Sequence, residues 1–191
     1  MQKTIVAATG NAHKLKEIRA ILSDWNIISQ REAGFHGEVE ETGATFGENA
    51  LIKAKAVCEA TGLPALADDS GLCVEALGGA PGVFSARYSG GGDADNRKLL
   101  LKNLQGKARE AYFASAVALV FPDGETFTAE GKTHGRILFE ETGENGFGYD
   151  SLFFSDDLNK SFGEAAEEEK NGVSHRGRAL LSLAESLRGK I

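Results

Sequence analysis

The sequence predicts an α/β domain, and three features of the chain support this fold class. The chain opens with the pattern strand, tight turn, helix, strand. A capped helix and an apolar strand follow, and the second half is rich in β-forming residues around a hairpin turn. Helices that alternate with buried strands favour a sheet covered by helices.

The opening is a βαβ unit. Residues 3–8 and residues 26–29 are short apolar runs of the kind that form buried strands. Between them, Leu15, Ile18 and Leu22 recur at helical spacing and predict a helix with one apolar face. The turn that enters this helix presents backbone N–H groups at a helix N-terminus, where the helix dipole favours an anion.

A second helix is predicted from a start signal at Thr45, which Glu48 follows at the spacing of a capping box, and a stop signal at Gly62. Beyond it, two short apolar runs flank the segment Ala67-Asp68-Asp69-Ser70-Gly71-Leu72. Aspartate, serine and glycine are common turn residues. The segment therefore predicts a sharp turn that presents carboxylate oxygens.

The second half predicts further strands and helices. Strands are expected over residues 83–88, 112–121, 125–130 and 135–139, with a turn at Pro122-Asp123-Gly124. Helices are expected over residues 95–104, weakly over the acidic residues 161–170, and after Ser174-His175-Arg176-Gly177.

Composition predicts one soluble globular domain over residues 1–191, with 41% hydrophobic and 26% charged residues. The net charge of −7 argues against a nonspecific nucleic-acid or membrane surface. Cys58 and Cys73 match no metal or redox spacing and are expected to be buried free thiols. No signal peptide and no apolar run of ~20 residues is visible, so a cytoplasmic location is expected.

The first helix start combines groups suited to phosphate: a hydroxyl, an amide, helix N–H groups and a lysine one turn in. These residues are Thr9, Gly10, Asn11, Ala12, His13 and Lys14. They match neither the P-loop nor the dinucleotide-binding pattern. The alternative is an Asn-capped helix with a solvated lysine.

Two acidic pairs, Glu40-Glu41 and Asp68-Asp69, flank the second helix. Carboxylates suit Mg²⁺, which takes one or two of them and completes its shell with water and phosphate. The alternative for each pair is a solvated loop or turn. A Ser-His-Asp hydrolase using Ser70 and His175 is disfavoured, because Ser70 lies in no G-x-S-x-G elbow.

Two later segments offer groups for a planar base or a phosphate. Phe147, Gly148, Tyr149 and Asp150 combine aromatic rings for stacking with a carboxylate for a ring N–H, or they form a turn whose aromatics fill the core. Lys170, His175 and Arg176 offer donors to a carbonyl or a phosphate. Cations at a helix start oppose its dipole, which favours a functional reason for the last two.

Six motifs appear in one order along nearly the whole chain. They are T-G-N-x-x-K from residue 9, E-E-T-G-x-T-F-x-E-N-A from residue 40, A-D-D-S-G-L from residue 67, L-G-G-x-P-G-V-x-S-A-R-Y-S-G from residue 77, G-F-G-Y-D from residue 146 and S-H-R-G from residue 174. In this combination the chain resembles the inosine/xanthosine triphosphate pyrophosphatase family, the pyrophosphatases of non-canonical purine nucleoside triphosphates.

The resemblance implies an elongated, two-lobed single α/β domain around a curved mixed β-sheet, with the nucleotide in a cleft between the lobes and with homodimer assembly. It also implies Mg²⁺-dependent hydrolysis of ITP, dITP and XTP to the monophosphate and pyrophosphate. Neither a nucleic acid nor a membrane is implied as a partner.

The resemblance assigns roles by position. Residues 9–14 would hold the triphosphate, and Asp69 would be the general base and a metal ligand. One of Glu40 and Glu41 would be the second ligand, with the choice left open. Contacts to substrate would come from Ser70, Phe147, Gly148, Tyr149, Asp150, Lys170, His175 and Arg176, to which we add Lys53 and Arg87.

The residues suggest how the purine is chosen. His175 or Arg176 is expected to donate a hydrogen bond to the 6-oxo group, because a donor facing the amine of adenine would be left unpaired. Two alternatives remain open: a pyrophosphatase for pyrimidine or other modified nucleotides, and a non-catalytic nucleotide sensor. The two acidic pairs argue against the sensor, which needs neither a base nor a metal.

Overall fold

The computed structural model describes residues 4–188, and its strands form one sheet in the order β2-β1-β3-β4-β5-β6-β7. The strands are β1 (Thr4–Ala7), β2 (Asn26–Ser29), β3 (Ala65–Val74), β4 (Glu110–Val120), β5 (Thr126–Ile137), β6 (Phe153–Ser155) and β7 (Lys160–Ser161). Strand β1 pairs in parallel with β2 and β3, whereas β6 is antiparallel to β5 and β7. The mixed sheet confirms the predicted α/β fold class.

Five α-helices accompany the sheet over the described residues, together with three short 3₁₀ helices. The α-helices are α1 (Ala12–Ile21), α2 (Phe46–Thr61), α3 (Asp93–Asn103), α4 (Glu167–Val173) and α5 (His175–Ser186). The 3₁₀ helices are η1 (Glu75–Leu77), η2 (Gly82–Arg87) and η3 (Asp150–Leu152). Within residues 4–188, no helix has the length and apolarity needed to cross a membrane.

The chain divides into two compact units. The described part of unit 1 comprises residues 4–69, 115–131 and 176–188, and unit 2 comprises residues 70–114 and 132–175. Strands β3, β4 and β5 each contribute residues to both units.

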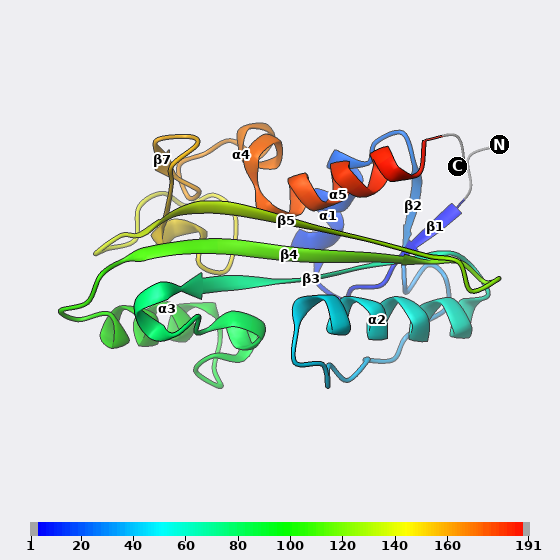
Figure 1. Cartoon of the computed structure of the whole chain (residues 1–191), viewed down its shortest axis with the longest axis horizontal. Helices are drawn as coiled ribbons and strands as arrows, with labels where there is room; N and C mark the ends of the chain where they lie inside the picture. Colours follow the sequence, from blue (N-terminus) through cyan, green and yellow to red (C-terminus); the bar gives the residue numbers. More distant parts are fainter. Residues whose placement is uncertain (1–3, 189–191) are drawn as a thin grey trace. The chain divides into compact units, whose positions relative to one another are not determined.

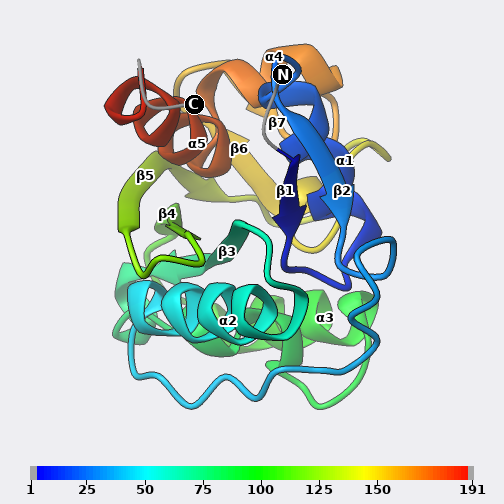
Figure 2. The same ribbon diagram turned by 90° about the vertical axis from the view of Figure 1, so that its right-hand side faces the viewer.

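Unit 1 is a three-layer sandwich, with α1 and α5 on one face of its strands and α2 on the other (Figures 1 and 2). Strand alternation explains the layers, because successive side chains point to opposite faces. Leu66 of β3 packs in the core under α1 and α5. Its neighbours Ala65 and Ala67 pack in the core under α2. Both faces of these strands are therefore buried.

Unit 2 has its own aromatic core, in which Phe113 contacts Phe153 and Phe162. Helix α3 contributes Leu100, which is fully buried. Tyr149 also lies in this core, and its hydroxyl donates a hydrogen bond of 2.7 Å to the carbonyl of Ser85. Residues that are far apart in the chain, such as Leu72 and Phe162, thus share one core.

Several local predictions are confirmed. The side chain of Asn11 caps α1 by accepting from the N–H groups of His13 and Lys14, and Thr45 caps α2. Gly62 ends α2 in the left-handed conformation, with φ of 65°. Both cysteines are buried and free.

The predicted sharp turn at residues 67–72 is wrong, because these residues lie in the middle of strand β3. Their composition is typical of a turn, but the strand is buried on both faces and its carboxylates find cations there. Local composition was overridden by these tertiary contacts, which a short window of sequence does not contain.

Other predicted elements also differ from the structure. The two strands expected over residues 125–130 and 135–139 are one strand, β5. Residues 83–88 were expected as a strand but form η2, where the hydroxyl of Ser85 accepts from the N–H of Leu72 and donates to the carbonyl of Gly82. The expected helix over residues 161–170 begins only at Glu167, because Lys160–Ser161 pairs with β6. The last helix begins at His175 rather than after Gly177.

Candidate active site

Asp68 is the most highly bonded carboxylate of unit 1. Its Oδ2 lies 2.8 Å from the Nζ of Lys14 and 3.2 Å from an Nη of Arg176. Its Oδ1 accepts a hydrogen bond of 2.5 Å from the hydroxyl of Ser115. Burial alone would raise the pKa of Asp68, but the charges of Arg176 and Lys14 outweigh it and hold that pKa well below its usual range.

Arg176 also pairs with Glu17 of α1, and its side chain is almost fully buried. Burial opposes the charge of this guanidinium, but the two carboxylates outweigh burial and raise its pKa further above the usual value. Arg176 lies in the first turn of α5, where the helix dipole disfavours a cation. Asp68 and Glu17 supply the negative charge that offsets the unfavourable interaction of Arg176 with the helix dipole.

Lys14 is not the solvated lysine of the alternative interpretation, because it is bound to Asp68. Burial is the main cause that lowers its pKa, with a further contribution from Arg176. The turn before α1 is ordered by short-range bonds: Thr9 accepts from the N–H of Asn11, and Asn11 accepts from two N–H groups.

Asp69 has a different environment on the α2 side of the strand. The Nζ of Lys53 lies 3.5 Å from its Oδ1, 2.7 Å from an oxygen of Glu41 and 2.9 Å from the carbonyl of Asp68. The Oδ2 of Asp69 is buried and has no hydrogen-bond partner among the residues that the structure describes. Burial raises the pKa of Asp69, and Glu41 adds to this effect while Lys53 opposes it.

Strand geometry therefore separates the adjacent aspartates. Because successive side chains of a strand point to opposite faces, Asp68 meets α1 and α5 whereas Asp69 meets α2. Each carboxylate has its own cations, and the pKa of Asp68 falls while that of Asp69 rises. Carboxylates whose pKa values are pushed apart are typical of paired roles at an active site.

The structure separates the two glutamates as well. Glu41 is half-buried and paired with Lys53, whereas Glu40 is exposed. Over residues 4–188, no group of three or more His, Cys, Asp or Glu side chains is arranged to hold a metal ion. Two carboxylates fit Mg²⁺ nonetheless, because its remaining ligands are commonly water and phosphate. The Nζ of Lys53, which contacts both Glu41 and Asp69, indicates that this pair can accommodate a cation.

A second group of predicted residues comes together in unit 2. The Nζ of Lys170 lies 2.7 Å from Asp150 and 5.0 Å from the ring centroid of Phe147. Asp150 also accepts a hydrogen bond of 2.9 Å from the N–H of Phe147. The ring of His175 is stacked on Phe113, with centroids 4.8 Å apart.

The aromatic residues of the Gly-rich loop divide between two functions. Tyr149 fills the core, and burial raises the pKa of its hydroxyl above the usual value. Phe147 remains partly exposed beside Lys170. The alternative in which an aromatic residue fills the core is therefore confirmed for Tyr149, and stacking of a base on Phe147 stays a prediction.

Sequence reasoning did not predict two contributors to the Asp68 cluster, Glu17 and Ser115. Glu17 follows Lys14 by three positions and lies beside the apolar residue Ile18, which marks it as an inward-facing carboxylate. Ser115 is a hydroxyl in an otherwise apolar strand. Both signals were present in the sequence, but only the fold shows which charge they meet.

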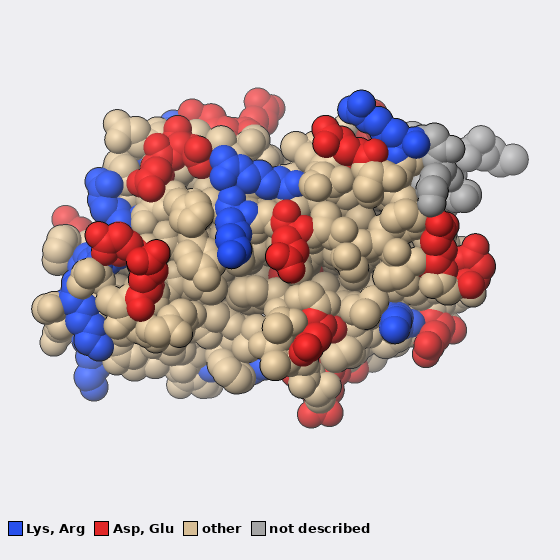
Figure 3. Space-filling view, viewed as in Figure 1, with Lys and Arg blue, Asp and Glu red and all other residues tan. Residues whose placement is uncertain are grey.

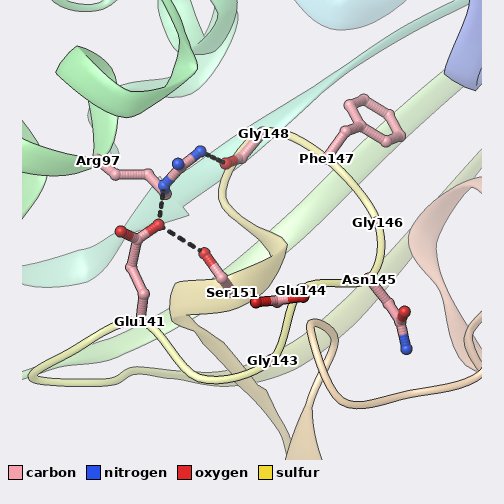
Figure 4. A pocket seen from close by; sticks show the side chains of 9 residues that line it. All are labelled: Arg97, Glu141, Gly143, Glu144, Asn145, Gly146, Phe147, Gly148 and Ser151. Atoms are coloured by element: carbon pink, nitrogen blue, oxygen red, sulfur yellow. Dashed lines mark hydrogen bonds and ion pairs between the residues drawn. The ribbon is translucent and has the colours of Figure 1, made fainter.

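Unit 2 also contains a cavity of about 520 Å³ that the sequence did not predict (Figure 4). It lies against the Gly-rich loop. Its lining residues are Arg97, Glu141, Gly143, Glu144, Asn145, Gly146, Phe147, Gly148 and Ser151.

Acidic and basic side chains are interspersed on the face of the molecule drawn in Figure 3. The cations of the Asp68 and Asp69 clusters are, in contrast, largely buried: the exposed fraction is 16% for the side chain of Lys14 and 13% for that of Lys53.

These observations define a class of protein. The charged clusters lie on β3 just beyond the point where its parallel pairing with β1 ends. Ligands of open α/β sheets bind at the carboxyl ends of the strands, and carboxylates with shifted pKa values are typical of catalytic sites. The chain is thus an α/β protein with the features of an enzyme that acts on a charged ligand.

The comparisons with known proteins give the family. The model of the Ham1 family matches residues 5–186, and the chain belongs to this family. A dITP/XTP pyrophosphatase of Haemophilus influenzae is 50% identical over 98% of this chain and all of the relative. One of Clostridium perfringens is 46% identical over 98% of each. The resemblance predicted from the six motifs is confirmed.

Solved structures agree. The Ham1 protein of Staphylococcus aureus has a TM-score of 0.88 at 39% identity and covers 99% of this chain and all of that one. A nucleoside-triphosphatase, dITP/XTP pyrophosphatase, of Mycobacterium abscessus has a TM-score of 0.75 at 45% identity, covering 94% of this chain and 98% of that one.

The two aspartates are predicted to differ in their effect on stability. Asp68→Asn is expected to lower the free energy of unfolding by ~3 kcal/mol, because buried Arg176 and Lys14 lose their counter-charge. Asp69→Asn is expected to leave it unchanged or raise it, because the cost of burying a charged carboxylate is removed. Urea denaturation at neutral pH measures both, and equal losses would contradict this division.

The same experiment has a pH signature. The pKa of Asp68 is lower in the folded protein, so its stabilisation is present above the unfolded value of ~3.9 and is lost as pH falls through the folded value. The difference between the wild type and Asp68→Asn should therefore be constant near neutrality and shrink below about pH 4. For Asp69 the sign is opposite, since a raised pKa means that stability is lost as pH rises through it.

Proposed function

We propose that this protein is a Mg²⁺-dependent nucleoside-triphosphate pyrophosphatase that hydrolyses ITP, dITP and XTP to the monophosphate and pyrophosphate. The observation that carries the proposal is the environment of Asp69: a buried carboxylate with a raised pKa and one unbonded oxygen, beside Lys53. The printed names of the relatives, dITP/XTP pyrophosphatase, support the same substrates.

Asp69 acts as the general base in this proposal. A raised pKa brings a carboxylate closer to neutral pH and makes it a better proton acceptor. Its Oδ2 can accept the proton of an attacking water. A hydrogen bond from the side chain of Asn49 partly offsets the rise in the pKa of Asp69. Asp68 cannot take this role as readily, because its oxygens are bound by Lys14, Arg176 and Ser115.

Cations are needed where the triphosphate lies, because it carries about four negative charges and charge grows on the leaving pyrophosphate. Residues 9–14 supply a capped helix start with Lys14, and α2 supplies Lys53. Asp68 holds the amine of Lys14 in place, so this amine is positioned before substrate binds.

Glu41 and Asp69 are the residues that would hold Mg²⁺, and the exposure of Glu40 favours Glu41 as the second ligand. Mg²⁺ would supply positive charge to the phosphate oxygens. Lys53 contacts both carboxylates and would have to move from between them when the metal binds.

Base recognition is assigned to residues of unit 2. Phe147 offers a partly exposed ring for stacking, while Lys170 and Asp150 form a buried ion pair beside it. His175 and Arg176 are the candidate donors to the 6-oxo group: His175 is stacked on Phe113, and the guanidinium of Arg176 is bonded to two carboxylates.

Homodimer assembly and a cytoplasmic location complete the proposal. Neither nucleic acid nor membrane is proposed as a partner, since the net charge is −7 and the charges on the face in Figure 3 are mixed.

Release of pyrophosphate from a panel of nucleoside triphosphates tests the proposal. With Mg²⁺, we expect ITP, dITP and XTP to be hydrolysed faster than ATP, GTP, UTP and dTTP, and EDTA should stop the reaction. Glu41→Gln should weaken the response to Mg²⁺, whereas the matched variant Glu40→Gln should not. Preferential turnover of UTP or dTTP would favour the pyrimidine alternative, and no turnover of any triphosphate would favour the sensor.

The base role predicts a separation of binding from turnover. Asp69→Asn should lower kcat by ~10²–10⁴-fold while ITP still binds, because the proton acceptor is lost and the amide keeps the shape of the side chain. Kinetics together with calorimetric binding of ITP measure the two effects. A kcat near that of the wild type would contradict the proposed role of Asp69 as the general base.

The site of attack can be located with isotopes. Water activated by Asp69 is expected to attack the α-phosphorus in line with the leaving pyrophosphate. Hydrolysis of ITP in ¹⁸O-labelled water should therefore place the label in the monophosphate, as read by mass spectrometry. Label in pyrophosphate would show attack at the β-phosphorus instead.

A further inference from the structure

The carbonyl and the N–H of Gly148 are each hydrogen-bonded to a side chain of helix α3. Arg97 of α3 donates a hydrogen bond of 2.8 Å to the carbonyl of Gly148, as Figure 4 shows. The N–H of Gly148 donates one of 3.1 Å to Asp93, which lies one helical turn earlier in α3. Residues four apart lie on the same side of a helix, so both side chains can reach one residue. Asp93 and Arg97 thus form a clamp on Gly148.

The clamp is itself held in place. The guanidinium of Arg97 pairs with Glu141, and Glu141 accepts a hydrogen bond of 3.0 Å from the hydroxyl of Ser151 (Figure 4). Glu141 therefore orients the guanidinium of Arg97, and Arg97 in turn orients the carbonyl of Gly148. A planar guanidinium with several donors in fixed directions is suited to this bridging.

The clamp matters because apolar packing is missing on that side of the loop. The cavity of about 520 Å³ lies against residues 143–148 and is lined mostly by glycine, glutamate and Arg97. A wall without packed neighbours loses the contacts that normally fix a loop. Gly148 has a φ of +62°, a conformation that glycine adopts at little cost and that leaves the chain easily altered. Directional hydrogen bonds must therefore set its position.

The neighbouring residue carries the ring proposed to stack on the base. Phe147 is fixed on its N-terminal side by the bond from its N–H to Asp150, which Lys170 holds in turn. On its C-terminal side, the peptide that follows is fixed by the clamp on Gly148. The backbone of Phe147 is therefore held from both sides.

We infer that Asp93 and Arg97 are positioning residues for the base-binding loop and determine how well the enzyme distinguishes hypoxanthine and xanthine from guanine and adenine. This inference rests on the proposed function. Discrimination between bases depends on placing polar and stacking groups within a fraction of an ångström. The contacts found for Asp93 and Arg97 are with residues of unit 2, whereas Asp69, Lys14 and Lys53 belong to unit 1.

The expected kinetic signature is a split between KM and kcat. Arg97→Ala removes the hydrogen bond from the charged guanidinium to the carbonyl of Gly148. We expect this variant to raise KM for ITP about tenfold and to lower the preference for ITP over GTP by a similar factor. The kcat for ITP should stay within about twofold, because the proposed base and the phosphate-binding lysines are unchanged. Asp93→Ala should act in the same direction.

Conservative and control variants complete the experiment. Arg97→Lys and Asp93→Asn keep one hydrogen-bonding group each and should recover part of the wild-type preference. Lys98→Ala is the matched control, because Lys98 is exposed on the same helix next to Arg97. Thermal melting identifies any variant that fails to fold; should Arg97→Ala unfold, Asp93→Ala removes only the acceptor for Gly148 and remains decisive.

The outcomes separate the inference from the function on which it rests. Wild-type turnover of ITP combined with unchanged KM and preference in folded Arg97→Ala and Asp93→Ala would overturn the clamp and leave the proposed function standing. An equal loss of kcat for all nucleotides would also overturn it, since that is a general structural effect. A wild type that releases no pyrophosphate from any purine nucleotide would overturn both.

Discussion

The buried charge cluster around Asp68 is the interaction on which the rest of unit 1 depends. It joins three elements of one sandwich: Asp68 lies on β3, Lys14 and Glu17 on α1, and Arg176 on α5. Each of these groups alone would be costly to bury, and only the complete set offsets the loss of hydration. The cluster therefore specifies how α1 and α5 meet the central strand, in addition to the apolar contacts of Leu66 and its neighbours.

The neighbouring aspartate has a different environment. Asp68 absorbs two cations on one face of β3, which leaves Asp69 on the other face with Lys53, Glu41 and an unbonded oxygen. The polypeptide obtains two carboxylates of opposite character from adjacent positions because a strand turns them to different layers. A turn, as predicted from composition, would have given both carboxylates the same solvent and the same role.

Much of the fold and part of the site could be predicted from local sequence signals. The caps at Asn11 and Thr45 and the apolar periodicity of the first helix were sufficient, because these signals act over a single turn. The strand at residues 65–74 was not, since its acidic centre is stabilised by Lys14, Lys53 and Arg176, which are distant in the chain. For the same reason, local sequence signals could not show that Tyr149 fills the core while Phe147 does not.

The seven charged side chains of the two clusters also set an electrical balance. Four are carboxylates (Glu17, Glu41, Asp68 and Asp69), and three are cations (Lys14, Lys53 and Arg176). With all of them ionised, the sum is 3 − 4 = −1, so the clusters hold no surplus of positive charge even though two lysines are present. A polyanion gains little from such a set on its own. A cation that arrives with a polyanionic ligand would reduce this negative sum, so the resting site is expected to favour a cation-bound form of its ligand.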